Sequence, residues 1–168
     1  WNWFGESKVV DDQGRPLVVY HGTKAAPDEN FAFDRRANVT ASDFYFTADR
    51  SIAEVYGRLQ PVYLSAPKLL DIRAEDIGSN GYAALRKVFK EGDFDAGGEV
   101  SFDEFVDRVT GGQMYDAGPS FQNEVLGWLA DENDGVLMTD AGFGGAMSES
   151  YVVFVPEQIK SVDNVGLF

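Results

Sequence analysis

Leu17-Val-Val-Tyr-His-Gly-Thr23 (LVVYHGT) joins an apolar run to the only histidine among the 168 residues. Branched and aromatic residues in succession predict a buried strand, which Pro16 precedes and His21 ends. Gly22 lacks a side chain and allows the backbone to approach a ligand closely. The histidine is therefore a candidate functional residue, and a structural residue at a strand end is the alternative.

The segments around this run alternate between strand and helix patterns. Asp11–Gly14 predicts a turn before the run, and Asp49 and Gly57 are expected to cap and stop a short helix. Ser120 is expected to cap the last of three helices, which the apolar spacing predicts between 82 and 132. Further strands are predicted at 44–47, 61–65, 68–72, 135–139 and 151–155. This order predicts an α+β fold with a central helical segment.

Composition limits the classes of partner. The chain carries 14 basic and 28 acidic residues, a net charge of −14, which repels phosphate backbones and anionic lipid surfaces. It has no cysteine, and no apolar run approaches the roughly 20 residues that span a bilayer. We therefore expect a soluble domain that binds neither nucleic acid nor membrane. Since the sequence starts WNWFGES without an initiator methionine, we expect it to belong to a longer polypeptide.

Several motifs, taken in order, resemble a known family. They are HGT at 21–23, YFT at 45–47 with Tyr56 further on, and Glu149 shortly before YVVF at 151–154. This set is similar to the His-Tyr-Glu class of ADP-ribosyltransferases, the group of diphtheria toxin and the poly(ADP-ribose) polymerases. The stretches 3–23 and 151–166 resemble still more closely the small domains of phage head-morphogenesis and other polyvalent proteins.

The resemblance implies a fold and a set of site residues. Residues 1–168 would form one domain built on a split, strongly bent antiparallel sheet, with 80–132 as a helical insertion. His21 would bind ribose hydroxyls of NAD, with Thr23 beside it, and the Gly22 backbone would hold the nicotinamide carboxamide. Tyr45 and Tyr56 would sandwich the nicotinamide ring. Glu149 would be the catalytic carboxylate, with His21 and Tyr45 completing the catalytic set.

Two positions depart from the family pattern. Ser150 separates Glu149 from Tyr151, whereas the family glutamate directly precedes the tyrosine, and one residue along a strand reverses the side chain. Either a bulge returns Glu149 to the cleft, or another acid, Asp140 or Glu157, replaces it. Ala53 stands where polymerase-like members often carry a serine that contacts the carboxamide.

Two loops suggest further roles. Residues 93–104 follow the spacing of an EF-hand, with Asp93, Asp95 and Glu104 as calcium ligands and Gly98 at the sharp turn. A solvated acidic turn between helices is the alternative. The loop 140–148, with Phe143 among glycines, resembles the acceptor-recognition loop of ribosylating toxins, and a plain connection is the alternative.

The expected activity is mono-ADP-ribosyl transfer from NAD to a macromolecule, with a bacterial protein as the leading acceptor, in a toxin or phage-effector setting. Mono rather than poly transfer follows from analogy to toxin-like and phage members. The alternatives are an NAD glycohydrolase and an inactive interaction module on the same fold. The sequence does not state a location, and action in the bacterial cytoplasm is the expectation for such an effector.

Overall fold

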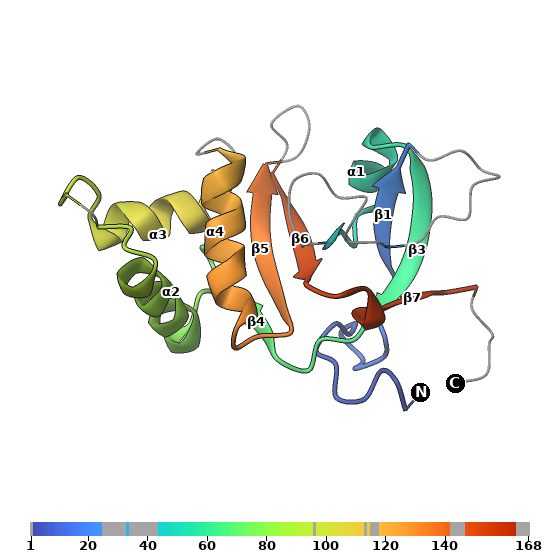
Figure 1. Cartoon of the computed structure of the whole chain (residues 1–168). Coiled ribbons are helices and arrows are strands. Elements are labelled where there is room, and N and C mark those ends of the chain that lie inside the picture. Colours follow the sequence, from blue (N-terminus) through green and yellow to red (C-terminus); the bar gives the residue numbers. More distant parts are fainter. Residues whose placement is uncertain are drawn as a thin grey trace.

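The computed structural model describes residues 2–24, 33, 44–95, 97–112, 114, 118–141 and 147–163. Figure 1 shows the arrangement of the strands and helices within these residues. The strands are β1 (Val19–Thr23), β2 (Phe44–Phe46), β3 (Arg58–Leu64), β4 (Leu69–Asp71), β5 (Gly135–Ala141), β6 (Met147–Val153) and β7 (Ile159–Ser161). The helices are α1 (Arg50–Val55), α2 (Ser79–Glu91), α3 (Phe102–Thr110), α4 (Pro119–Ala130) and the short 3₁₀ helix η1 (Pro156–Gln158).

The strands form two sheets that meet at one point. One sheet has the order β1-β3-β7, and the other has the order β2-β6-β5-β4. Between them, Tyr20 and Thr47 exchange two backbone hydrogen bonds of 2.8 and 3.0 Å. The rest of β1 does not pair with β2, so the sheet bends and splits there. This arrangement confirms the predicted α+β class with a split, bent sheet.

One strand pair differs from the expected antiparallel pattern. β4 and β5 run parallel, with Leu70 opposite Val136. Parallel neighbours need a long crossover connection. Helices α2, α3 and α4 supply it, because all three lie between β4 and β5 in the chain.

Two hydrophobic cores lie on the two faces of the four-stranded sheet. The inter-sheet core joins this sheet to the three-stranded one and contains Val19, Phe46, Leu64 and Tyr151 among its buried residues. The helix-side core joins the other face to α2, α3 and α4. Figure 1 shows these helices on one side of β5 and β6 and the three-stranded sheet on the other. Two-sided burial fixes which side chains of the central strands point to which core.

Local signals explain most of the helix ends. Asp49 caps α1 by accepting a 2.8 Å hydrogen bond from the Ser51 backbone N–H, and Gly57 follows with a φ of 128°. The expected cap at Ser120 is wrong, because α4 begins at Pro119 with Gly118 in the cap position. Proline is favoured in the first helical turn, where its missing N–H has no partner to lose.

Several strands extend further than predicted, and two of them carry candidate site residues. β1 continues through Thr23, so His21 lies within it rather than at its end. β6 begins at Met147, four residues before the predicted start, so Glu149 lies inside the strand. Among the helices in the described part of the chain, none has the length and apolar character to cross a lipid bilayer.

Candidate functional site

The ring of His21 lies at the junction of the two sheets. Its Nδ1 is 2.9 Å from the backbone oxygen of Tyr45. Because a carbonyl oxygen only accepts, Nδ1 carries the proton and donates a hydrogen bond to it. The ring also packs against Phe33 and Phe46, with centroid separations of 5.4 and 5.7 Å. Burial lowers the pKa of His21, and the hydrogen bond to Tyr45 opposes this only in part. The neutral ring then presents Nε2 as its acceptor nitrogen.

Gly22 allows helix α1 to lie directly against β1. A β-carbon at this position would stand 2.1 Å from the backbone oxygen of Ala53 and 2.7 Å from the Tyr56 β-carbon. The glycine therefore permits close approach of α1 and places Tyr56 beside the His21-Gly22 segment. Tyr56 is exposed at 42%. Ala53 lies at the same contact, where the family pattern often has serine.

Thr23 and Tyr45, the other two predicted NAD contacts, lie near His21 but are less exposed than Tyr56. Thr23 ends β1 and is buried. Tyr45 is half-buried on β2, opposite Val152, and its ring packs against the helix-side core. The structure thus brings His21, Gly22 and Tyr56 together. It connects Tyr45 to them through its backbone oxygen.

The register of β6 decides the direction of Glu149. The pairing with β5 is continuous from Met147 to Val153, so no bulge interrupts it. Glu149 consequently shares a face with Tyr151, which belongs to the inter-sheet core, and Ser150 faces the helix-side core. His21 shares a face of β1 with Val19, another residue of the inter-sheet core. His21 and Glu149 therefore project from the two sheets toward the space between them, whereas Tyr45 points to the opposite face.

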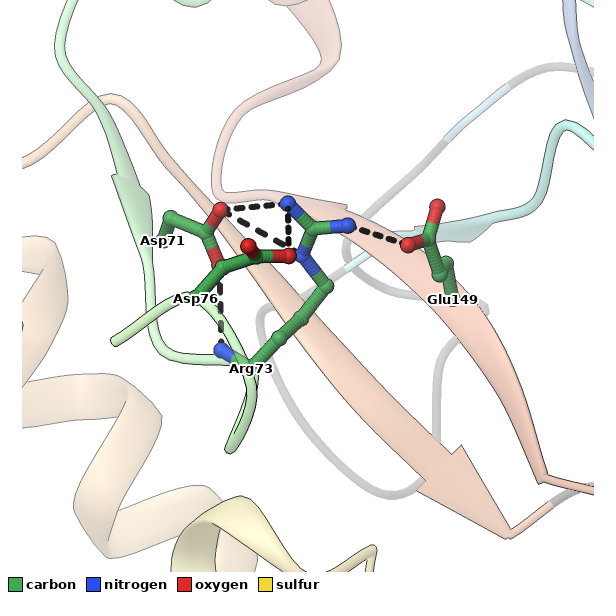
Figure 2. Close-up of polar contacts among 4 residues, drawn as sticks. All are labelled: Asp71, Arg73, Asp76 and Glu149. Carbon is green, nitrogen blue, oxygen red and sulfur yellow. Dashed lines mark hydrogen bonds and ion pairs between the residues drawn. The ribbon is translucent and has the colours of Figure 1, made fainter. Parts of the chain in front are cut away.

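Glu149 has a cationic partner that the sequence reasoning missed. Its Oε1 accepts a hydrogen bond from Nη1 of Arg73, in the loop after β4 (Figure 2). Asp71 and Asp76 hold the same guanidinium through Nη2 at 2.6 and 3.0 Å. The hydrogen bond to Asp71 and, secondarily, that to Glu149 raise the pKa of Arg73, so it stays charged. Burial alone would raise the pKa of Asp71, but the hydrogen bonds from Arg73 outweigh it and lower that pKa.

The two substitute acids lie in different places. Asp140 is half-buried on β5 opposite Ser148, on the face that also carries Met138 of the helix-side core. Glu157 is exposed on η1, beyond the end of β6, and its backbone oxygen accepts a 2.9 Å hydrogen bond from the Trp3 indole. Of the three acids, Glu149 is the one on the inter-sheet face of β6.

In the loop 93–104, which was predicted to bind calcium, Glu104 instead helps to cap helix α3. Glu104 accepts hydrogen bonds of 2.9 and 2.8 Å from the backbone and hydroxyl of Ser101, which closes a capping box at the start of α3. These bonds lower the pKa of Glu104. Within the described residues, no three acidic or histidine side chains gather into a metal-binding group. A calcium site at Asp93, Asp95 and Glu104 is therefore not supported. The other predicted loop contact, Phe143, lies outside the described residues.

Comparison with known proteins identifies the class. A split sheet with a histidine-glycine pair at its junction is the arrangement expected of an ADP-ribosyltransferase domain, and the family comparison shows that the chain is of this class. The chain belongs to the family of ADP-ribosyltransferases in polyvalent proteins, whose model matches residues 11–167. Enzymes of this class use NAD as their substrate.

The fold also resembles a solved structure described as the crystal structure of an anti-CRISPR protein. The TM-score is 0.52 at 15% sequence identity, over 87% of this chain and 95% of the other. At that identity the likeness concerns the fold alone. No curated protein matches the chain.

Proposed function

We propose that this domain is a mono-ADP-ribosyltransferase that cleaves NAD and transfers ADP-ribose to a protein. The observation that carries the proposal is the meeting of β1, α1 and β2 around His21 and Gly22, with Glu149 on the same inter-sheet side. An imidazole acceptor and an exposed aromatic ring suit the ribose and nicotinamide parts of NAD.

The binding roles follow from these surroundings. Nε2 of His21 accepts a hydrogen bond from a ribose hydroxyl, and the backbone of Gly22 and Thr23 holds the carboxamide. The Tyr56 ring covers one face of the cationic nicotinamide, because aromatic faces attract cations. Tyr45 contributes its carbonyl oxygen, which fixes the His21 ring, whereas its own ring lies on the helix-side face and does not complete the expected aromatic sandwich.

Glu149 acts on the bond that breaks. The glycosidic bond between ribose and nicotinamide breaks and nicotinamide leaves with the electron pair, so positive charge develops on the ribose. A fixed carboxylate stabilises that charge, as in glycoside hydrolysis. A nucleophilic group of the acceptor then bonds to the ribose carbon and releases a proton, which the carboxylate can accept. The products are ADP-ribosylated acceptor, nicotinamide and a proton.

A protein is the favoured acceptor. The net charge of −14 disfavours approach of a nucleic acid, and a local cationic group, Arg73, is already surrounded by carboxylates. The family name refers to polyvalent proteins, and the solved structure of similar fold is described as an anti-CRISPR protein. We extend the proposal to an effector that modifies a protein in the bacterial cytoplasm.

Label transfer from adenine-labelled NAD into a bacterial lysate tests the proposal. The wild type should attach label to protein, and His21→Ala, Tyr56→Ala and Glu149→Gln should each transfer less, with at least about a 100-fold loss for Glu149→Gln. Tyr82→Ala is the matched control, because Tyr82 is exposed at 46% on α2, compared with 42% for Tyr56.

The same experiment separates the alternatives. Free labelled ADP-ribose without labelled protein would indicate a glycohydrolase. Unchanged NAD, together with no heat of NAD binding, would indicate an interaction module that has kept only the fold.

A further inference from the structure

Arg73 is held in place by two carboxylates before it reaches Glu149. Its Nε lies 3.1 Å from Oδ1 of Asp71, and its Nη2 lies 2.6 Å from Oδ2 of the same residue. The Arg73 backbone N–H also donates to Asp71, at 3.0 Å, and Asp76 contacts Nη2 at 3.0 Å. A guanidinium held along one edge in this way has a fixed orientation, because its planar fork matches a carboxylate.

The opposite edge of the guanidinium faces Glu149. Nη1 donates to Oε1 of Glu149, which joins the loop after β4 to β6 across 76 residues (Figure 2). Within the part of the chain that the structure describes, Oε2 of Glu149 accepts no hydrogen bond, and the side chain is exposed at 53%. Arg73 therefore holds one oxygen of the carboxylate, and the other has no such contact within the described residues.

Stability alone is a weak reason for this arrangement. A surface ion pair contributes about 0–1 kcal/mol. The Arg73 side chain is only 22% exposed, but three carboxylates surround this one cation, so repulsion among them offsets part of the attraction. Supporting side chains that orient a reacting group, in contrast, commonly matter for activity far more than for stability. Within the described residues, no other hydrogen bond or ion pair fixes the rotatable bonds of the Glu149 side chain.

We propose that Arg73 is a positioning residue that orients the Glu149 carboxylate toward NAD, an inference that rests on the function proposed above. Asp71 and Asp76 fix the guanidinium, Arg73 holds Oε1, and Oε2 meets the ribose. The register of β6 puts Glu149 on the inter-sheet side, where His21 projects from the other sheet, and Arg73 orients the carboxylate there. The role of Arg73 is exerted through Glu149 and requires no contact with NAD.

Steady-state kinetics of nicotinamide release test this role. Arg73→Gln should lower kcat about 10- to 100-fold and leave KM for NAD within a factor of about two, because the carboxylate acts on the breaking bond. Arg73→Lys should fall between wild type and Arg73→Gln, since it keeps the charge but loses the fork. Lys87→Gln is the matched control, because it removes a cation from another surface pair, with Glu132 on the helical side. Both variants should stay folded at the assay temperature, which Tm measurements check, although Arg73→Gln also leaves the half-buried Asp71 without its cationic partner.

A double-variant cycle identifies the route of the effect. In a Glu149→Gln background, measured at excess enzyme, Arg73→Gln should cause no further loss. An unchanged kcat in Arg73→Gln, an equal loss in the Glu149→Gln background, or a change in KM alone would overturn the positioning role. If the wild type releases no nicotinamide, the proposed function itself fails, so the two failures are distinguishable.

Discussion

His21 is held as a neutral ring by its surroundings. Two phenylalanine rings cover it, and Nδ1 donates to the Tyr45 carbonyl oxygen. Burial lowers its pKa, and the hydrogen bond compensates only in part. A neutral imidazole with a fixed tautomer is suited to accept a hydrogen bond from a ribose hydroxyl, whereas the charged form offers no acceptor.

The lowered pKa predicts how stability depends on pH. The unfolded chain binds a proton at His21 below about pH 6.5, more readily than the folded chain does. The stability that depends on neutral His21 is therefore complete above pH 6.5 and decreases as the pH falls toward the lower folded pKa. The free energy of unfolding of wild type, relative to His21→Asn, should fall between pH 7.5 and 5, by about 1.4 kcal/mol per unit of pKa depression.

Urea unfolding at several pH values measures this difference. The acidic residues titrate in both proteins, so subtracting one from the other removes their contribution. A difference that stays constant over this range would show that His21 is not buried as a neutral ring.

At this scale the sequence identified some residues and missed others. His21 and Gly22 could be named as candidates because their motif is local, but the space beside Gly22, expected to admit a ligand, is occupied by α1. Arg73 could not be named, because its partner Glu149 is 76 residues away and only the pairing of β4, β5 and β6 brings them together. The direction of Glu149 also needed the register, which shows no bulge.

Among the elements, α1 and β1 form the closest contact of the site. Gly22 meets the backbone of Ala53, so an added methyl group has no space there without moving the helix. Tyr56 follows α1 directly, so its ring moves with the helix. The position of the Tyr56 ring, a proposed NAD contact, therefore depends on the packing of α1 against Gly22 of β1.

Gly22→Ala should separate α1 from β1. We expect it to lower the free energy of unfolding by about 1–3 kcal/mol, as overpacking does, and to weaken NAD binding. Gly127→Ala is the control, because nothing lies within 4 Å of its added carbon on α4, and alanine favours helices. Urea unfolding and NAD titration calorimetry measure both effects. Equal stability of Gly22→Ala and wild type would contradict the close contact.

Most element types were predictable, but η1, β7 and several ends were not. The turn at Asp11–Gly14, the capped helix after Asp49 and the three apolar stripes all gave the observed elements. The predicted start of β6 was too late, because Met147 is an isolated apolar residue and the next three residues are polar. These four residues nevertheless pair with β5. Pairing with a neighbouring strand overrides local preference, which is why the strand extends over Glu149.

In the whole molecule, the candidate site lies between the two sheets. The helix-side core and the inter-sheet core bury opposite faces of the four-stranded sheet, so each side chain of β6 has a defined direction. The family motifs predicted the split sheet, but not the parallel pairing of β4 with β5. That pairing depends on how the segment 80–132 packs, and the motifs do not cover this segment.

Release of nicotinamide from NAD, compared between wild type and Glu149→Gln, tests the central claim most directly. If His21, Tyr56 and Glu149 act together on NAD, the wild type should release nicotinamide well above the rate without protein. Glu149→Gln should then be slower by at least about 100-fold while its Tm stays the same. Equal rates for the two proteins, or a wild-type rate equal to that without protein, would contradict the account.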